Sequence, residues 1–365
     1  MNDFEKVLNQ LNIAYKKDEP MSIHTTFKIG GPADYFIEIT EQEKLVELIK
    51  LCIKSKTKFT ILGWGSNVLV SDDGIRGVVI RNRTSEIEVM DKDSHRSISI
   101  EKQKEDLDIR HVTSDAIKRG LYEFEDLDYD ESNKPVAKLR LESGVNLPKA
   151  ITWTITNGYT GLQWYSGIPG TIGGAIFNNI HGGTHLFEEL IESVTVLDLK
   201  SGEKKTLTRE EMMFKYDTSI IHKTNDVVLD AVLNLRMGDK DRALFTAKEW
   251  YTRKSVQPRN TPGCVWKNIT IEQQKELDFE SNATGYIIDQ KLGWRGSKKI
   301  GGAYISDKHA NFIENTGDAT AIDVLKLIKL TKEEVKKRFN IDLHSEIVFL
   351  GFKSRDLDEI LEDIE

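Results

Sequence analysis

Apolar residues near the start of the chain recur at two different spacings, and each spacing predicts a different kind of element. Residues 3–11 and 41–55 place apolar side chains at the three- and four-residue intervals of one helix face. Short apolar runs at 35–39, 59–62 and 77–80 are bounded by Gly or Asp turn signals and predict strands. The first part of the chain is therefore expected to mix helices with short strands.

The same two spacings continue through the middle and the end of the chain. Strands are expected at 137–142, 194–197 and 227–235, and helices at 147–157 and 242–255. Further strands are expected near Tyr304 and Ile347. Between them lies an amphipathic helix, in which one apolar face is expected to contain Ile322, Leu325, Ile328 and Val335.

Residues 101–135 break this pattern because they are densely charged and carry few apolar side chains. Such a segment offers too little apolar surface to offset the entropy of ordering it. We expect a surface insertion that lies outside any active site.

Composition excludes several classes of protein. A length of 365 residues favours two or three domains, and the 39% hydrophobic and 30% charged residues are typical of a globular protein without a membrane span. A net charge of −8 argues against nucleic acid as a general partner. The two cysteines are too few for a disulfide framework or a zinc site, so we expect no metal. Because the N-terminus lacks the features of a secretory signal, a cytoplasmic location is expected.

Two glycine-rich segments are the first candidates for chemistry. Glycine lets the backbone turn tightly and approach a ligand, and short hydroxyl and amide side chains suit a pyrophosphate. The spacing of the glycines does not match the usual dinucleotide fingerprint, and a simple turn or a compact packed loop remains an alternative for each segment. The residues expected to bind a cofactor are Gly63, Gly65, Ser66 and Asn67 in the first segment, and Gly167, Pro169, Gly170, Thr171, Gly173 and Gly174 in the second.

Together with residues 26–33, these two segments resemble the three flavin-binding segments of the UDP-N-acetylenolpyruvoylglucosamine reductases, in the same order. Each match is weak alone, but the ordered set is specific and covers nearly the whole chain outside the charged insertion. The matches continue downstream through Arg253, Gln257-Pro258, 263–268, Ile288-Asp289, Gly293, 301–303, 306–313 and Glu346 before 347–351.

This resemblance implies an α+β protein: a two-subdomain FAD-binding fold of the PCMH type followed by a C-terminal α/β substrate-binding domain. The implied units are residues 1–82, residues 83–238 with the insertion at 101–135, and residues 239–365. It also implies non-covalent FAD, NADPH as hydride donor, and reduction of UDP-N-acetylglucosamine enolpyruvate to UDP-N-acetylmuramate for peptidoglycan. A monomer is expected, with the UDP-sugar substrate and NADPH as its partners.

The resemblance also implies roles for single residues. Cys264 stands at the proton-donor position, where many members of the family have Ser, and a thiol is acidic enough to serve there. Glu346 occupies the position of the carboxylate that assists protonation. The residues implied in substrate binding are Tyr216, Arg253, Lys267 and Asn268.

The chain departs from the family pattern at the position of an arginine that helps to polarise the enolpyruvyl group. Asp217 stands there, and a carboxylate places negative charge near a developing enolate. Loss of one such donor typically costs about 3 to 4 kcal/mol in the barrier. Three alternatives stay open: another cation substitutes, Asp217 pairs with such a cation, or the activity is altered. The candidate cations are Lys215, Arg253, Lys267 and Arg295.

Two other matched segments also differ from the family. Thr25 replaces an Asn, and the second glycine-rich segment continues as Ile180-His181-Gly182-Gly183 in place of Gly-Ala-Tyr-Gly. Lone loop histidines are more often structural than catalytic, so His181 and His309 are given no role. Two alternatives stay open: a flavin-dependent oxidoreductase of another small substrate, and a non-catalytic flavin- or nucleotide-binding relative.

Overall fold

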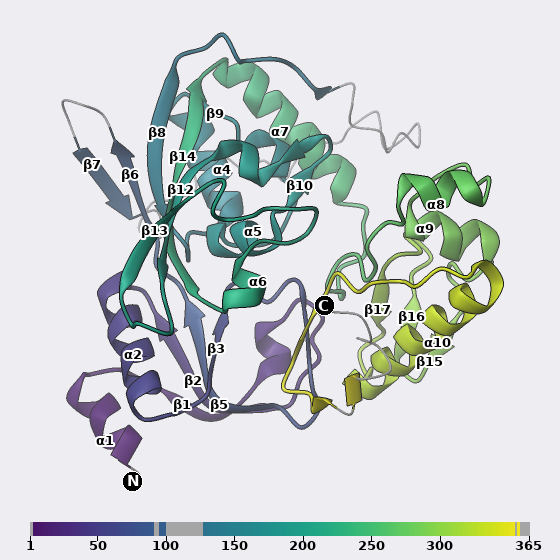
Figure 1. The fold of residues 1–365 in the computed structure, drawn as a ribbon, viewed down its shortest axis with the longest axis horizontal. Helices are drawn as coiled ribbons and strands as arrows, with labels where there is room; N and C mark the ends of the chain where they lie inside the picture. The colour runs from purple at the N-terminus through teal and green to yellow at the C-terminus, as the bar shows by residue number, and fades with distance from the viewer. Residues whose placement is uncertain (1–2, 91–94, 100–126, 355, 358–365) are drawn as a thin grey trace.

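The computed structural model describes residues 3–90, 95–99, 127–354 and 356–357. Figure 1 shows a smaller sheet at the lower left, a larger sheet above it, and a C-terminal group of helices and short strands at the right. The charged segment expected at 101–135 lies mostly outside the described residues, which resume at Leu127.

The first sheet has four strands in the order β1-β2-β5-β3. Strands β2 and β3 both pair in parallel with β5, whereas β1 is antiparallel to β2. Helix α2 buries Leu45, Leu48, Ile49 and Cys52 in the core of this sheet, which confirms the helical spacing in the sequence. The elements of this part are α1 (Asp3–Gln10), β1 (Lys16–Pro20), η1 (Met21–His24), β2 (Pro32–Ile39), α2 (Gln42–Lys54), β3 (Phe59–Leu62), β4 (Val68–Val70) and β5 (Ile75–Asn82).

The larger sheet has seven strands in the order β13-β12-β14-β8-β6-β7, with β9 beside β14. All its pairings are antiparallel. Its strands are β6 (Glu86–Met90), β7 (His95–Ser99), β8 (Val136–Glu142), β9 (Tyr159–Thr160), β12 (Ile191–Leu197), β13 (Lys204–Thr208) and β14 (Val227–Met237). One face is covered by α4, α5 and α7 (Figure 1). The remaining elements are α4 (Leu147–Thr156), η5 (Gln163–Tyr165), α5 (Ile172–Asn178), β10 (His181–Gly182), β11 (His185–Leu186), η6 (Phe187–Leu190), α6 (Ile221–Thr224) and α7 (Lys240–Lys254).

The C-terminal part packs α10 over a three-stranded sheet, β15-β16-β17. Leu325, Ile328 and Val335 are buried on α10 as the sequence predicted, but Ile322 is 46% exposed. Ile322 stands in the first turn, where its neighbours Ala321 and Val324 face the core instead, so this part of the prediction was wrong. The elements are α8 (Ile271–Glu276), α9 (Thr284–Tyr286), the π-turn Ile287–Lys291, β15 (Lys299–Ile300), β16 (Ala303–Ile305), β17 (Ile313–Asn315), α10 (Ala321–Phe339) and β18 (Val348–Leu350).

Strand β18 returns the end of the chain to its beginning. It pairs in parallel with β4, which lies just after the first glycine-rich segment. Phe27, Ile29 and Leu69 from the N-terminal part pack in the core of the C-terminal part. The last strand therefore attaches the C-terminal part to the first cofactor-binding segment.

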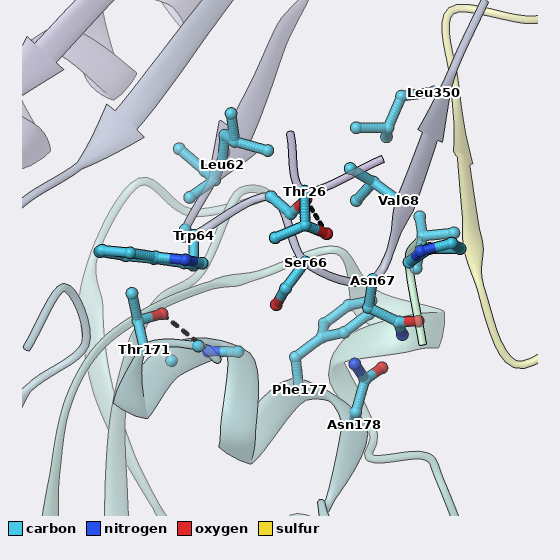
Figure 2. A pocket seen from close by; sticks show the side chains of 18 of the residues that line it. Thr26, Leu62, Trp64, Ser66, Asn67, Val68, Thr171, Phe177, Asn178 and Leu350 are labelled. Carbon is cyan, nitrogen blue, oxygen red and sulfur yellow. Dashed lines mark hydrogen bonds between the residues drawn. The ribbon is translucent and has the colours of Figure 1, made fainter. Parts of the chain in front are cut away.

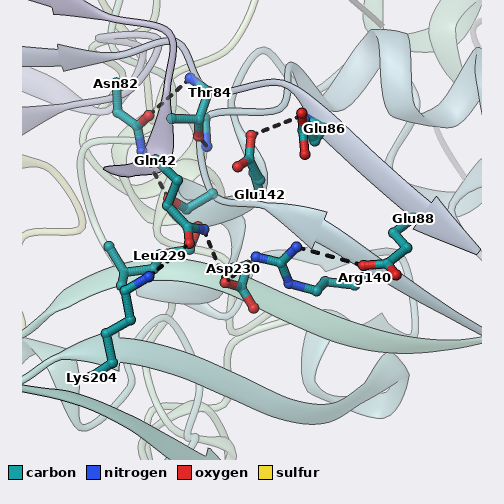
Figure 3. Close-up of polar contacts among 12 residues, drawn as sticks. Gln42, Asn82, Thr84, Glu86, Glu88, Arg140, Glu142, Lys204, Leu229 and Asp230 are labelled. Atoms are coloured by element: carbon teal, nitrogen blue, oxygen red, sulfur yellow. Dashed lines mark hydrogen bonds and ion pairs between the residues drawn. The ribbon is translucent and has the colours of Figure 1, made fainter. Parts of the chain in front are cut away.

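A buried polar network joins the two sheets (Figure 3). Gln42 of α2 donates from Nε2 to Asp230 Oδ2 at 3.0 Å and to the Leu229 carbonyl at 3.2 Å. Arg140 of β8 donates to the same Asp230 oxygen at 2.8 Å. Because buried polar groups are costly unless they are paired, this network favours one relative placement of the sheets.

The end of the predicted charged insertion is not loosely attached. Leu127 is only 7% exposed and belongs to the core of the larger sheet. Gln163 donates to the Tyr129 hydroxyl at 3.1 Å, and Glu131 accepts a hydrogen bond from the Thr160 hydroxyl at 2.6 Å. The prediction of a surface insertion was therefore wrong for residues 127–131. It rested on the high charge of the whole stretch and overlooked these few anchoring side chains at its end.

Candidate active site

A cavity of about 2390 Å³ lies where the two sheets and the C-terminal part meet. Its lining includes both glycine-rich segments, and it also includes Asp217, Cys264 and Glu346. The structure therefore brings together residues that lie far apart in the sequence. The ten residues expected to bind the cofactor all line this cavity.

The first glycine-rich segment connects β3 to β4 and faces α5 across the cavity (Figure 2). Gly65 has φ +73°, and a Cβ there would lie 2.2 Å from the His24 carbonyl oxygen, so only glycine fits. Ser66 Oγ donates to the Pro169 carbonyl at 2.6 Å, which ties the two glycine-rich segments together. Asn67 donates from Nδ2 to the Glu346 carbonyl at 3.1 Å. This loop therefore positions both the second segment and a candidate catalytic residue.

The second glycine-rich segment leads into α5. Thr171 caps the helix by accepting a hydrogen bond from the Gly174 amide at 3.2 Å. The Gly173 amide donates to the Ser143 carbonyl at 2.8 Å, and a Cβ on Gly173 would lie 2.9 Å from Ser143 Cβ. Glycine at 173 therefore lets α5 pack closely against the end of β8.

The backbone of this second segment is open toward the cavity. Among the described residues, apart from the two chain neighbours, no atom lies within 4 Å of the position that a Cβ on Gly170 would occupy, and only Thr171 Oγ1, at 3.5 Å, lies near that of Gly174. The cavity also exceeds the roughly 300–1,000 Å³ of ordinary small-molecule sites. Its lining includes the 39% exposed Trp64. These features fit a large flat cofactor such as FAD, with room for a second ligand.

The segment that carries Cys264 is held between two other segments of the C-terminal part. The Val265 amide donates to the Asn311 carbonyl at 2.8 Å, and the Glu346 amide donates to the Val265 carbonyl at 2.8 Å. The buried Asn311 side chain bonds both the amide and the carbonyl of Trp266, at 2.9 and 2.8 Å. Cys264 and Glu346 are therefore brought together by the backbone.

Burial governs the protonation of both groups. It raises the pKa of the Cys264 thiol well above its ordinary value, and the nearby carboxylates of Glu346 and Asp217 raise it further. Burial, followed by the charge of Asp217, raises the pKa of Glu346 to about 8. At neutral pH both groups therefore hold their protons, as a proton-donating pair requires.

Asp217 lies in a tight turn whose ends, Lys215 and Thr218, exchange backbone hydrogen bonds at 3.1 and 3.2 Å. Its φ of +51° is left-handed, a conformation that Asp tolerates better than most residues do. The turn is held by Asn179, whose Nδ2 donates to the Lys215 carbonyl at 3.1 Å. The Asp217 side chain, 5% exposed, has one oxygen 3.6 Å from His181 Nδ1, while the other has no hydrogen-bond partner among the described residues.

The two other departures from the family pattern fall in different places. His181 lies beside Asp217 and stacks on Tyr216, with 5.4 Å between ring centres, so two departures from the pattern meet at the cavity. Thr25 is buried, and its hydroxyl donates to the Ile29 carbonyl at 3.2 Å. His309 is held within its own loop, where its Nδ1 accepts from the Asn311 amide at 3.2 Å.

The four residues expected to bind substrate lie beside the cavity and are not part of its lining. Tyr216 accepts a hydrogen bond from Asn268 Nδ2 at 3.5 Å, and Lys267 and Asn268 line a separate hollow of about 120 Å³. Arg253 is 5% exposed and lies 3.7 Å from Glu249. None of the four cations considered as replacements for the family's arginine lines the main cavity or pairs with Asp217 among the described residues.

Trp64, Ser143 and Lys254 also line the cavity and were not predicted. Trp64 is part of the first glycine-rich segment, so its position in the sequence was a signal that could have been used. Ser143 follows a predicted strand, and Lys254 is an ordinary basic residue at the end of a helix. Neither residue carries a sequence signal that separates it from many similar ones.

The described residues contain no group of three or more His, Cys, Asp or Glu side chains placed to hold a metal ion. No helix in the described part of the chain has the length and apolar character needed to cross a membrane.

Comparison with known proteins gives consistent matches. The family model "UDP-N-acetylenolpyruvoylglucosamine reductase, C-terminal domain" matches residues 256–350, and an FAD binding domain model matches residues 125–208. The chain is 33% identical over 339 residues to a UDP-N-acetylenolpyruvoylglucosamine reductase of Halalkalibacterium halodurans, with 92% of this chain and 93% of the relative covered. It is 34% identical over 341 residues to UDP-N-acetylenolpyruvoylglucosamine reductase 1 of Bacillus anthracis, with 92% and 94% covered.

A solved structure agrees with these sequence matches. The UDP-N-acetylenolpyruvylglucosamine reductase of Thermus caldophilus superposes with a TM-score of 0.64 at 25% identity. The match covers 93% of this chain and 98% of that one. The similarity therefore extends over both sheets and the C-terminal part.

Proposed function

Because the chain belongs to the UDP-N-acetylenolpyruvoylglucosamine reductase family, we propose that it reduces UDP-N-acetylglucosamine enolpyruvate to UDP-N-acetylmuramate with NADPH as hydride donor. As a member of that family, it is an FAD-dependent oxidoreductase of peptidoglycan precursor synthesis. The observation that carries the proposal is the position of Cys264 and Glu346, which line the same cavity as two open glycine-rich segments. When bound, FAD supplies the hydride chemistry that no side chain can provide.

The glycine-rich segments hold the cofactor without a covalent bond in this proposal. The open backbone at Gly170 and Gly174 lets a flat ligand approach closely, and Ser66 and Thr171 add hydroxyl groups nearby. Gly63 packs closely against Thr171, since a Cβ on Gly63 would lie 2.8 Å from Thr171 Oγ1. Both segments therefore contribute to one binding surface.

Cys264 donates the proton that C2 of the substrate requires, and Glu346 assists it. The geometry supports these two roles because the hydrogen bond from the Glu346 amide to the Val265 carbonyl holds the segments of Glu346 and Cys264 side by side. Burial keeps both groups protonated at neutral pH, as described above. The proposal also assigns substrate binding to four residues that lie beside the cavity and outside its lining: Tyr216, Arg253, Lys267 and Asn268.

The cavity lies where three units meet, and we assign them as residues 1–82, 83–238 and 239–365. Each unit supplies most of one apolar core, although every core also takes a few side chains from another unit. Helix α7 follows residue 238 in sequence but packs Ala243, Ala247 and Trp250 into the core of the larger sheet. The boundary between the second and third units in the sequence therefore differs from the boundary between their cores by helix α7. We further assign the working protein as a cytoplasmic monomer that binds neither nucleic acid nor membrane.

An anaerobic two-step experiment tests the proposed function. NADPH is added to the FAD-loaded protein, and the enolpyruvyl sugar nucleotide is added after the flavin absorbance has bleached. The proposal expects bleaching in the first step and full return of the absorbance in the second. Bleaching without return would favour a flavin oxidoreductase of another substrate, and no bleaching would favour a non-catalytic relative, for which Asp217 is the main support.

A further inference from the structure

His24 is the last residue of the short turn η1, and its backbone supports the first glycine-rich segment. A Cβ on Gly65 would lie 2.2 Å from the His24 carbonyl oxygen, so the two backbones are in direct contact. Two residues later, the Thr26 amide donates to the Gly65 carbonyl at 3.0 Å. The first glycine-rich segment therefore rests on residues 24–26.

The same three residues also reach the segment of the candidate proton donor. Thr26 Oγ1 donates to the Thr261 carbonyl at 2.8 Å. The Thr261 hydroxyl accepts from the Gly263 amide at 3.3 Å, one residue before Cys264. Thr26, Thr261 and Cys264 all belong to the lining of the main cavity. A displacement of residues 24–26 would therefore move both walls of the cavity.

The His24 side chain lies outside the cavity lining and is held by three neighbours. It is 9% exposed, and its ring stacks on Phe36 of β2 with 4.0 Å between ring centres. Nε2 lies 2.9 Å from Glu19 Oε1, and Nδ1 lies 3.0 Å from a guanidinium nitrogen of Arg81. The ring therefore links three strands of the first sheet, since Glu19 belongs to β1 and Arg81 to β5.

These contacts determine where the His24 ring carries its proton. An arginine side chain donates hydrogen bonds and cannot accept them. Nδ1 must therefore accept from Arg81 through its lone pair, and it carries no proton. The ring proton lies on Nε2, which donates it to Glu19. His24 is neutral in this arrangement.

A second proton on the ring would disrupt this arrangement. It would place an N–H group opposite the Arg81 guanidinium, so that repulsion between two cations replaces a hydrogen bond. Glu19 would attract the charged ring, but it already pairs with Lys16 at 2.7 Å. Glu38 lies 3.7 Å from Arg81 and 3.6 Å from Arg83, so its charge is shared. Protonation would therefore separate Arg81 from the ring.

Arg81 connects this network to the start of the first glycine-rich segment. In the parallel pairing of β5 with β3, Arg81 stands opposite Leu62, the residue that precedes Gly63. The segment is therefore held at its start by the strand of Arg81 and at Gly65 by the backbone of His24.

We propose that neutral His24 is a positioning residue that fixes the first glycine-rich segment for FAD and, through Thr26, holds the segment of Cys264 beside it. A charged ring loosens both segments, so FAD affinity depends on the protonation of a side chain that does not touch the cofactor. The inference concerns cofactor affinity and the exposure of a thiol, and neither depends on the proposed reduction.

FAD titration of the FAD-free protein tests the positioning role without turnover. His24→Phe can keep the stack on Phe36 but removes both hydrogen bonds, so it should weaken FAD binding by about tenfold or more near neutral pH. His24→Asn, whose side-chain oxygen can accept from Arg81, should recover part of this affinity. Ile23→Ala, at a 65% exposed position of the same turn, is the matched control. Binding is followed by the quenching of flavin fluorescence.

The pH dependence of FAD binding separates positioning from packing. Histidine is the side chain that ordinarily gains its charge between about pH 8 and pH 5. The parent should therefore lose FAD affinity as pH falls through this range, by about tenfold at pH 5. His24→Gln cannot gain the charge and can still donate an amide hydrogen to Glu19. Its FAD affinity should change by less than about twofold over the same range.

Alkylation by iodoacetamide reports on the segment of Cys264. Loss of the His24 contacts should loosen the Thr26 hydrogen bond to Thr261 and expose the thiol more often. In FAD-free His24→Phe, modification of Cys264 should be faster than in the parent by about threefold or more. Mass spectrometry follows the reaction, with the fully buried Cys52 as internal reference.

An FAD affinity of His24→Phe equal to that of the parent and of Ile23→Ala would overturn the proposal. Equal losses in the Phe, Asn and Gln variants at every pH would also overturn it, because they would show a packing role only. An unchanged alkylation rate would overturn the link to Cys264. If His24→Phe folds poorly, the Asn and Gln variants decide. Failure of the reduction itself would contradict the proposed function and leave these outcomes as they stand.

Discussion

At the scale of single residues, the cavity lining holds the carboxyl groups of Asp217 and Glu346 and the thiol of Cys264. The family pattern has an arginine at the position of Asp217. Like charges in one buried site cannot both be ionised cheaply, so one carboxyl group retains its proton. Glu346 is the group whose pKa is raised, with Asp217 as its nearest acidic neighbour. Burial first, and then the charge of Asp217, therefore keep Glu346 in the form that can donate a proton.

The raised pKa of Glu346 predicts a pH-dependent gain in stability for Glu346→Gln. The ordinary value is 4.5 and the folded value about 8, so the folded state binds an extra proton between them. The contribution of the Glu346 carboxyl group to the free energy of unfolding is fully present below about pH 4.5 and is lost as pH rises through about 8. Urea unfolding of the FAD-free protein from pH 5 to 8 should show the advantage of Glu346→Gln growing with pH. The exposed Glu276→Gln on α8 should show no such trend, and a constant difference for Glu346→Gln would contradict the assignment.

The proposed role of Cys264 as proton donor predicts that its removal separates the two half-reactions. Bleaching by NADPH needs no proton at C2, so Cys264→Ala should leave it nearly unchanged. Return of the absorbance with the enolpyruvyl substrate should fall by about 100-fold or more, as expected for loss of a general acid. Cys264→Ser, which restores the residue common in the family, should keep much of the rate. Rapid mixing decides the matter, and an unchanged return in Cys264→Ala would make Cys264 a packing residue.

Cys264, Glu346 and Asp217 could be identified from the sequence because each stands in a segment with several matched neighbours. Lys254 could not be identified in this way. It follows the matched Arg253, but a lysine at the end of a helix is common, and the sequence does not show that this one belongs to the lining of the cavity. The pairing of His181 with Asp217 could not be predicted either, because the two residues lie in different segments. The hydrogen bond that joins these segments runs from Asn179 to Lys215, 36 residues further along the chain.

At the scale of elements, the long amphipathic helices and apolar strands were predicted well, and the short polar ones were missed. Helices α2, α4 and α7 lie within a few residues of their predicted bounds, and α10 contains the predicted amphipathic stretch. Strand β13 reads Lys-Lys-Thr-Leu-Thr with mostly exposed side chains, so its sequence carries no alternation that predicts a strand. Strand β13 forms because it pairs with β12, and a local sequence pattern does not show such pairing between distant residues.

The segment after the charged stretch predicts a measurable loss of stability when its anchor is removed. Leu127 is 7% exposed in the core of the larger sheet, so Leu127→Ala should lower the free energy of unfolding by about 2–4 kcal/mol. Lys134→Ala, at an exposed position of the same segment, should change it little. Urea unfolding of both variants tests this, and equal stabilities would show that Leu127 is not an anchor.

The open backbone at Gly170 predicts a variant that folds but does not hold flavin. Since no atom of the described residues, apart from the chain neighbours, lies within 4 Å of a Cβ at this position, a leucine side chain at 170 has room to extend into the cavity. Circular dichroism should remain that of the parent, whereas FAD released on denaturation should fall in the order Gly, Ala, Leu. Full flavin content in Gly170→Leu would place the cofactor elsewhere in the cavity.

At the scale of the whole molecule, the fold class and the family inferred from the sequence are confirmed, and the cavity explains why so many matched segments are far apart. Gly65, Gly170 and Glu346 lie in different parts of the chain and line one space. The order of the matched segments predicted that they would bind one cofactor. The relative placement of the sheets depends on contacts such as that between Gln42 and Asp230, which no local pattern contains.

Because the cavity is lined from both sheets and the C-terminal part, FAD should stabilise the molecule as a whole. A ligand that binds only the folded state adds about 2.7 kcal/mol at a concentration 100-fold above its dissociation constant. Thermal unfolding of the FAD-free protein should therefore shift upward with added FAD, in a single transition reported equally by all the tryptophans. Gly170→Leu should show a smaller shift or none. A shift confined to one of several transitions would show that the cofactor stabilises only part of the chain.

The pairing of β18 with β4 has a consequence for the order in which the enzyme matures during synthesis. The hydrogen bond from Asn67 to Glu346 spans 279 residues, so the ribosome must release almost the entire chain before this contact can close. Closing so long a loop is entropically costly and slow compared with forming local contacts. The two glycine-rich segments can meet much earlier, because both precede α7. A growing chain can therefore assemble its nucleotide pocket well before it gains the carboxyl group that completes its chemistry.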